Sequence, residues 1–271
     1  MTDLGPRTPR WVSACGVLSG LVSGLLGVGG GLVVSPMLLL AGLPLRRATG
    51  TALAVIPTVA LMAVVADLIT LPGNLHPGLA LVIAAGGPIG IQLGRAIDRR
   101  LAVHTLKRLF QLLLLITACR SLGIFGALPD AALPGLFPDN AVASYLLAGA
   151  LGTAAGVCAI LFGVGGGIVV VPGLLLLVGG VDFRAATAAS LLAMVPTTLL
   201  SLRVALRDNR VERSYLRGLM LGAVPAAALA VALRNLWLQP PMLSILFGSF
   251  LLFTVVKMML NRSDAGDSDP R

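Results

Sequence analysis

Charged and aromatic side chains are scarce in this chain. Of its 271 residues, 11% are Asp, Glu, Lys or Arg and 4% are Phe, Trp or Tyr, whereas an ordinary soluble domain carries about 25% charged residues. The shortage of charge excludes a soluble globular protein. The net charge of +9 does not indicate nucleic-acid binding, because the basic residues are not regularly interleaved with aromatic residues that could stack on bases. It indicates arginines on the cytoplasmic loops of a membrane protein.

Cysteine and histidine are too few and too scattered for a disulfide framework or a metal site. The three cysteines, Cys15, Cys119 and Cys158, lie in apolar segments without a CxxC spacing, which favours small buried side chains over disulfides or metal ligands. The phosphate-binding motif GxxxxGK[ST] does not occur, and no Ser/His/Asp or paired-carboxylate arrangement is evident. We therefore expect no cofactor.

Apolar residues, in contrast, make up 57% of the chain. Several uncharged runs approach the ~20 residues that a helix needs to cross a bilayer, which predicts an all-α, polytopic membrane protein. These runs cover residues 48–66, 77–94, 185–202, 218–233 and 235–256. The first apolar run also resembles a signal peptide. We reject that interpretation because its central motif returns in the second half of the chain, and cleavage would remove one member of a matched pair.

The returning motif divides the chain into two repeats. Gly27–Pro36 reads GVGGGLVVSP, and Gly163–Pro172 in the second half reads GVGGGIVVVP. The segments that follow, 45–58 and 183–198, are similar at an offset of 138 or 139, and the sequence leaves this choice open. The predicted organisation is a first transmembrane repeat at 11–128, a proline-containing linker at 129–140, a second repeat at 141–260 and a polar tail at 261–271.

The glycines predict that a helix breaks at the same place in each repeat. As one helix, the uncharged run 11–45 would be about 52 Å long, against a hydrocarbon core of about 30 Å. Glycine costs about 1 kcal/mol per helical position relative to alanine, and proline removes a backbone donor. Because proline suits the first turn of a helix, we expect short second helices to begin near Pro36 and Pro172.

The basic residues indicate that each broken run turns back at its glycines. If each run crossed the membrane once, 11 basic residues would face the cytoplasm and 9 the other side. If each run goes in and returns, as two spans or as a re-entrant pair, the counts become 17 and 3. The positive-inside rule favours the second arrangement. Each repeat then crosses an odd number of times, so the repeats are inverted and both termini are cytoplasmic.

Inverted repeats with an interrupted helix in each half are typical of secondary transporters, whose substrate binds at the interruptions. Amides released at the glycines, together with the positive helix ends that follow, would suit a small anion, and hydroxyls at the start of the next helices could add donors. The predicted substrate-binding residues are Gly27, Gly29, Gly30, Gly31, Pro36 and Thr51 in the first repeat and Gly163, Gly165, Gly166, Gly167, Pro172 and Ser190 in the second.

Other residues leave alternatives open. Asp67, near the end of an uncharged run, is either a proton or cation site or an interfacial residue, and Gln92 bonds either a neighbouring helix or the substrate. The GxxxG pattern at Gly90 and Gly94 favours helix packing. The alternative functions are a transporter of another solute, such as a metal ion or an amino acid, and a membrane-embedded enzyme.

The paired GVGGG…P segments, followed by RATGTAL and RAATAASLL, resemble the sulfite exporter TauE/SafE family of membrane permeases over residues 11–260. The resemblance implies a secondary transporter in a prokaryotic inner membrane that moves sulfite, sulfoacetate or another organosulfonate by alternating access. The expected partners are this small anion, the lipid bilayer and a coupling proton, with nucleic acid excluded and homo-oligomerisation left open. Thr51-Ala52 stands where the family often has Thr-Ser, so a hydroxyl is missing at position 52.

Overall fold

The computed structural model describes residues 9–98, 111–112, 115–116, 118–119, 121–124, 140–178 and 180–260. Within these residues every regular element is a helix, so the all-α fold predicted from the sequence is confirmed. Nearly all of the predicted linker at 129–140 and the whole predicted tail at 261–271 lie outside the described residues.

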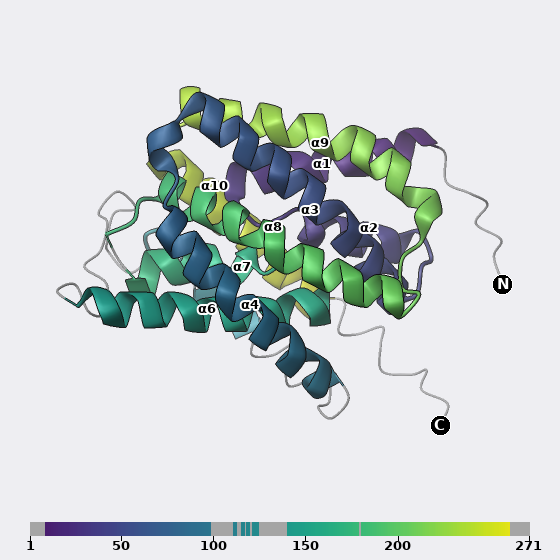
Figure 1. Cartoon of the computed structure of the whole chain (residues 1–271). Coiled ribbons are helices and arrows are strands. Elements are labelled where there is room, and N and C mark those ends of the chain that lie inside the picture. Colours follow the sequence, from purple (N-terminus) through teal and green to yellow (C-terminus); the bar gives the residue numbers. More distant parts are fainter. Residues whose placement is uncertain are drawn as a thin grey trace.

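Most of the helices are long, and the short helices α2 and α7 each follow one glycine motif (Figure 1). The elements are α1 (Pro9–Leu26), α2 (Gly31–Leu40), α3 (Leu45–Thr70), the 3₁₀ turn η1 (Pro72–Asn74), α4 (Pro77–Asp98), α6 (Ala141–Phe162), α7 (Gly167–Gly173), its π-helical continuation η2 (Leu174–Val178), α8 (Phe183–Arg207), α9 (Arg213–Leu236) and α10 (Pro240–Leu260). Five of them, α3, α4, α6, α8 and α9, are long and apolar enough to cross a membrane. The chain is thus a multi-pass membrane protein.

Both glycine motifs break the helix, as predicted. α1 ends at Leu26 and α6 at Phe162, and each is followed by four residues, Gly27–Gly30 and Gly163–Gly166, before the next helix begins. Three glycines in each break have φ between 66° and 85°, which favours glycine over any residue with a Cβ. The backbone conformation therefore explains why this residue type stands at these positions.

The expectation that the second helices begin near the prolines is wrong. α2 begins at Gly31 and α7 at Gly167, which places Pro36 and Pro172 inside these helices. The reason is the left-handed conformation of the preceding N-cap residues, Gly30 and Gly166, which turns the chain so that the helix can begin at once. The prolines then remove one internal hydrogen bond each, which membrane helices tolerate when neighbouring groups compensate.

Helices α3 and α8 run antiparallel across the middle of the molecule (Figure 1). At one end Arg47, near the start of α3, forms a 3.4 Å ion pair with Glu212, which follows α8. At the other end Arg234 donates to Thr187 near the start of α8 and to Asp67 near the end of α3. The loops α2–α3 and α8–α9 thus lie at the same end of the molecule. This favours runs that turn back at the glycines, because single crossings would separate these loops.

Parallel pairs of helices pack through glycine stripes. On α1, a Cβ at Gly16, Gly20 or Gly24 would overlap the carbonyl oxygen of Leu219, Ala223 or Ala227 of α9. Between α4 and α6, a Cβ at Gly90 would overlap Thr153 O, and one at Gly94 would overlap the side chain of Ile160. The GxxxG pattern at these two glycines therefore serves close helix packing.

Alanine substitution on α6 separates the packing role of glycine from its low helix propensity. A Cβ at Gly152 would overlap the backbone of Ile83, whereas one at Gly149 would meet only Val82 Cγ1, at an ordinary 3.6 Å. We expect Gly152→Ala to lower stability by about 1–3 kcal/mol through overpacking. Gly149→Ala should be neutral or stabilising by up to about 1 kcal/mol. Thermal unfolding of both purified variants tests the pair, and equal Tm values would contradict the packing role.

Candidate functional site

The two glycine breaks lie directly against each other in the centre of the molecule. A Cβ at Gly31 would overlap the carbonyl oxygen of Gly163, and a Cβ at Gly167 would overlap the carbonyl oxygen of Gly27. Neither of these two glycines has a positive φ. The close approach of the two backbones, rather than backbone conformation, therefore requires glycine here.

Each break also rests on the long helix, α3 or α8, that comes after the short helix following the other break. A Cβ at Gly27 would be 2.8 Å from Thr187 Cβ on α8, and a Cβ at Gly163 would be 2.8 Å from Thr49 Cβ on α3. Ile56 and Met194 likewise both lie against Gly29 and Gly165. Thr49 thus corresponds to Thr187, and Ile56 to Met194. Both correspondences have an offset of 138, which decides the alignment that the sequence left between 138 and 139.

The breaks present backbone amides that the helices leave unused. Among the described residues, the amides of Val28, Gly29 and Gly30 donate to no backbone acceptor, and neither do those of Val164, Gly165 and Gly166. All six residues are buried. A buried amide without an acceptor is costly in an apolar environment, so a cluster of them at two helix starts is an environment in which an oxyanion is stabilised.

Two hydroxyls on neighbouring helices bond to the breaks. Ser190 Oγ on α8 donates to Gly27 O at 3.0 Å, and Ser19 Oγ on α1 donates to Gly30 O at 3.1 Å. The hydroxyl oxygens of Ser23 and Ser35 are buried without a hydrogen-bond partner among the described residues. The sequence analysis selected Ser190 but not the other three serines. Ser19 and Ser23 stand before the glycine motif, Ser35 stands inside it between a valine and a proline, and none of them has a distinctive spacing.

Three of the predicted site residues lie away from the glycines. Thr51 Oγ1 donates to Arg47 O at 2.7 Å and accepts from Glu212 N at 2.9 Å, so it joins α3 to the loop before α9. Pro36 and Pro172 lie in the second turns of α2 and α7. The structure brings together the eight motif glycines and Ser190, and leaves these three residues outside that group.

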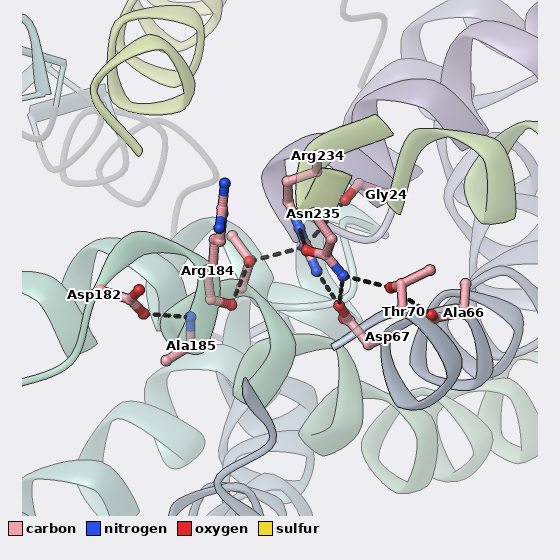
Figure 2. A network of polar contacts seen from close by, with 10 residues as sticks. Gly24, Ala66, Asp67, Thr70, Asp182, Arg184, Ala185, Arg234 and Asn235 are labelled. Atoms are coloured by element: carbon pink, nitrogen blue, oxygen red, sulfur yellow. Dashed lines mark hydrogen bonds and ion pairs between the residues drawn. The ribbon is translucent and has the colours of Figure 1, made fainter. Parts of the chain in front are cut away.

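A buried polar network adjoins the first break (Figure 2). Arg234 and Asp67, both 0% exposed, form an ion pair through Arg234 Nη2 and Asp67 Oδ1. Arg234 Nη1 donates to Gly24 O at 3.1 Å and to Thr187 Oγ1 at 2.8 Å. Asn235 Nδ2 donates to Asp67 Oδ1 at 2.8 Å and to Thr70 Oγ1 at 2.7 Å. The network joins α1, α3, α8 and α9 at one end of the molecule.

The sequence analysis counted Arg234 among the three basic residues that do not face the cytoplasm, and it left Asp67 undecided. The structure shows both side chains fully buried. A signal was present, because Arg234 is the one charged residue between the uncharged runs 218–233 and 235–256. An ionisable residue inside an apolar stretch of this length indicates a functional group with a buried partner.

Comparison with known proteins supports transport across a membrane. A family model described as "Sulfite exporter TauE/SafE" matches residues 2–121 and 148–271. A curated protein of Methanocaldococcus jannaschii, named "Probable membrane transporter protein", is 49% identical over 43 residues. This match covers 16% of the present chain and 16% of that relative. No solved structure matches the chain.

Proposed function

The chain belongs to the sulfite exporter TauE/SafE family, and on this premise we propose that it is a secondary transporter of small oxyanions. It is a membrane transporter by family, which favours transport over catalysis. The proposed substrate is sulfite or an organosulfonate, and the proposed site is the junction of the two glycine breaks. The observation that carries the proposal is the set of buried amides at this junction.

The chemistry of the junction fits an oxyanion better than a cation. Six backbone N–H groups of the breaks have no backbone acceptor among the described residues, and a backbone N–H group can only donate. The helices α2 and α7 begin at Gly31 and Gly167, so the positive ends of their dipoles adjoin the same place. A sulfite or sulfonate group has three oxygens, each of which can accept from several of these donors.

Access to this site requires movement, since the breaks are closed off. Every residue of Gly27–Gly31 and of Gly163–Gly167 is buried. In the proposed mechanism the two halves of the chain are inverted repeats that rock against each other, which opens the junction first to one side of the membrane and then to the other. The reciprocal contacts of the breaks with α3 and α8 support such a pairwise arrangement.

Flux of radiolabelled sulfite into proteoliposomes of the purified full-length protein tests the function. Saturable flux that unlabelled sulfite or sulfoacetate suppresses, and that a chloride excess does not, is the expected result. Counterflow, in which internal unlabelled sulfite accelerates uptake, would distinguish a carrier from a leak. If the protein moves none of these anions, the proposed substrate class is wrong.

The proposed orientation places both termini and the loops α2–α3 and α8–α9 in the cytoplasm. Single cysteines at the exposed positions Gly42, Asn209 and His76 test this in a variant whose three native cysteines are replaced by alanine. In intact cells, a membrane-impermeant thiol reagent is expected to label His76→Cys and to leave Gly42→Cys and Asn209→Cys unlabelled. Labelling of Gly42→Cys and Asn209→Cys from different sides would contradict inverted repeats.

A further inference from the structure

The Asp67–Arg234 ion pair is one contact away from the first glycine break. Arg234 Nη1 donates to Thr187 Oγ1 at 2.8 Å, and Thr187 lies against Gly27, where a Cβ would be 2.8 Å from Thr187 Cβ. The same Nη1 donates to Gly24 O in the last turn of α1. Figure 2 shows the guanidinium between Gly24 and Asp67. A long cationic side chain thus reaches the edge of the proposed anion site.

We propose that Arg234 is the cation that receives the transported anion, and that Asp67 holds this cation until the anion displaces it and then takes up one proton. The inference deepens the proposed function and rests on it. A guanidinium suits the role because it forms paired, charge-assisted hydrogen bonds with oxyanions. The structure then represents the state in which Arg234 is bonded to Asp67 and not to the substrate.

The charge balance of this exchange predicts proton coupling. When Arg234 turns from Asp67 to the anion, Asp67 is left as a buried carboxylate without a cation, a state that favours binding of a proton. Asp67 Oδ2 is buried without a hydrogen-bond partner among the described residues and is the atom available for that proton. One anion and one proton therefore move together, and no bond within the substrate changes.

The ion pair has no counterpart in the other half of the chain. When α8 is aligned with α3 at the offset that the glycine contacts give, Ala205 corresponds to Asp67. When α4 is aligned with α9 at the proline inside each helix, Ile97 corresponds to Arg234. In the described part of the chain, Asp67 and Arg234 are also the only fully buried charged side chains. The other half of the chain therefore packs without such a pair, so the fold does not require one. A single pair is expected if its role is functional and the transporter needs it only once.

Other charged groups near this end of the molecule are engaged elsewhere. Asp182 Oδ1 accepts from Ala185 N at the start of α8, and Arg184 Nη2 donates to Leu238 O. Figure 2 shows Asp182 and the Arg184 guanidinium apart from Asp67. His76 is exposed in the loop after η1. The remaining charged residues of the helices around the pair lie at their opposite ends, namely Arg10 of α1, Arg46 and Arg47 of α3, Arg203 and Arg207 of α8, and Arg213 and Arg217 of α9.

Two variants of the full-length protein test the proposal by sulfite flux in proteoliposomes. The double variant Asp67→Asn with Arg234→Gln leaves no unpaired charge. It is expected to fold but to lose flux by about tenfold or more, the scale of a lost hydrogen bond to a charged group. Asp67→Asn alone keeps the cation and mimics a protonated Asp67. Its accumulation of sulfite, measured relative to its own counterflow, is expected to lose its response to an imposed proton gradient.

The outcomes separate this proposal from the proposed function. Arg184→Gln, which removes an arginine at the same end of α8, serves as the matched control and should transport like the wild type. If the double variant retains wild-type flux, the pair only joins helices and the inference is wrong. The inference is also wrong if sulfite accumulation by Asp67→Asn responds to the proton gradient as it does in the wild type. Protonation of sulfite in solution is the same for both proteins, so a difference between them reports on Asp67 alone. A wild type that moves no sulfite overturns the function and this inference together.

Discussion

Alanine at Gly31 or at Gly167 is expected to abolish anion flux while the protein still inserts into the membrane. A Cβ at Gly31 would overlap Gly163 O and lie 2.8 Å from Ile56 Cδ1 and 2.9 Å from Val164 Cα, so backbone atoms, and not only a flexible side chain, are in its way. The two breaks must then separate, which moves the amide donors out of register with a substrate oxyanion. A misplacement of about 1 Å in such a site is enough to reduce activity by about 100-fold.

Gly73→Ala is the matched control for this pair of variants. Gly73 also lacks a positive φ, and a Cβ there would meet nothing within 4 Å. Sulfite flux should therefore remain at the wild-type level in Gly73→Ala and disappear in Gly31→Ala and Gly167→Ala, while the amount of protein recovered from membranes stays similar. Wild-type flux in both break variants would show that the contact between the breaks does not form the site.

The sequence predicted the place of the breaks because their cause is local. Gly27, Gly29 and Gly30 adopt a backbone conformation that other residues avoid, and the same holds for Gly163, Gly165 and Gly166. A conformational requirement of this kind acts on the residue type at one position, so it appears directly in the sequence. Its return in the second half of the chain then indicated two equivalent units.

The start of the second helices was not predictable from the same pattern. Proline at the first turn is only a preference, and it gave the wrong helix start for α2 and α7. Their true starts depend on the left-handed N-caps Gly30 and Gly166. The contact between Gly31 and Gly163 O joins the two halves of the chain, and no local preference reports a contact between residues so distant in sequence.

The buried network was missed because hydropathy alone could not place its members in depth. Asp67 stands in the last turn of α3, and Arg234 in the last turn of α9, where charged residues ordinarily reach the interface. Their burial follows from the parallel packing of α9 on α1, which brings Arg234 onto Gly24 O. A charged pair at two helix ends could therefore be read as interfacial until the packing was known.

Breaking the Asp67–Arg234 pair from one side is expected to destabilise the protein more than removing both charges. Arg234→Gln leaves Asp67 buried without a cation, and a one-sided loss of this kind costs about 3–5 kcal/mol, or roughly 10 °C in Tm. The double variant with Asp67→Asn leaves two amides that can bond to each other, so it should recover most of that loss. Arg47→Gln breaks the ion pair with Glu212, whose side chains are 58% and 33% exposed, and should cost no more than about 1 kcal/mol.

Thermal unfolding of the four purified proteins in detergent checks this prediction as a double-mutant cycle. The wild type, Arg234→Gln, Asp67→Asn and the double variant are compared at one pH, with Arg47→Gln measured beside them. A double variant whose loss equals the sum of the two single losses would mean that the two side chains do not interact as the structure shows. Recovery of stability together with loss of sulfite flux in the double variant would separate folding from transport, because only transport then needs the charge of Arg234.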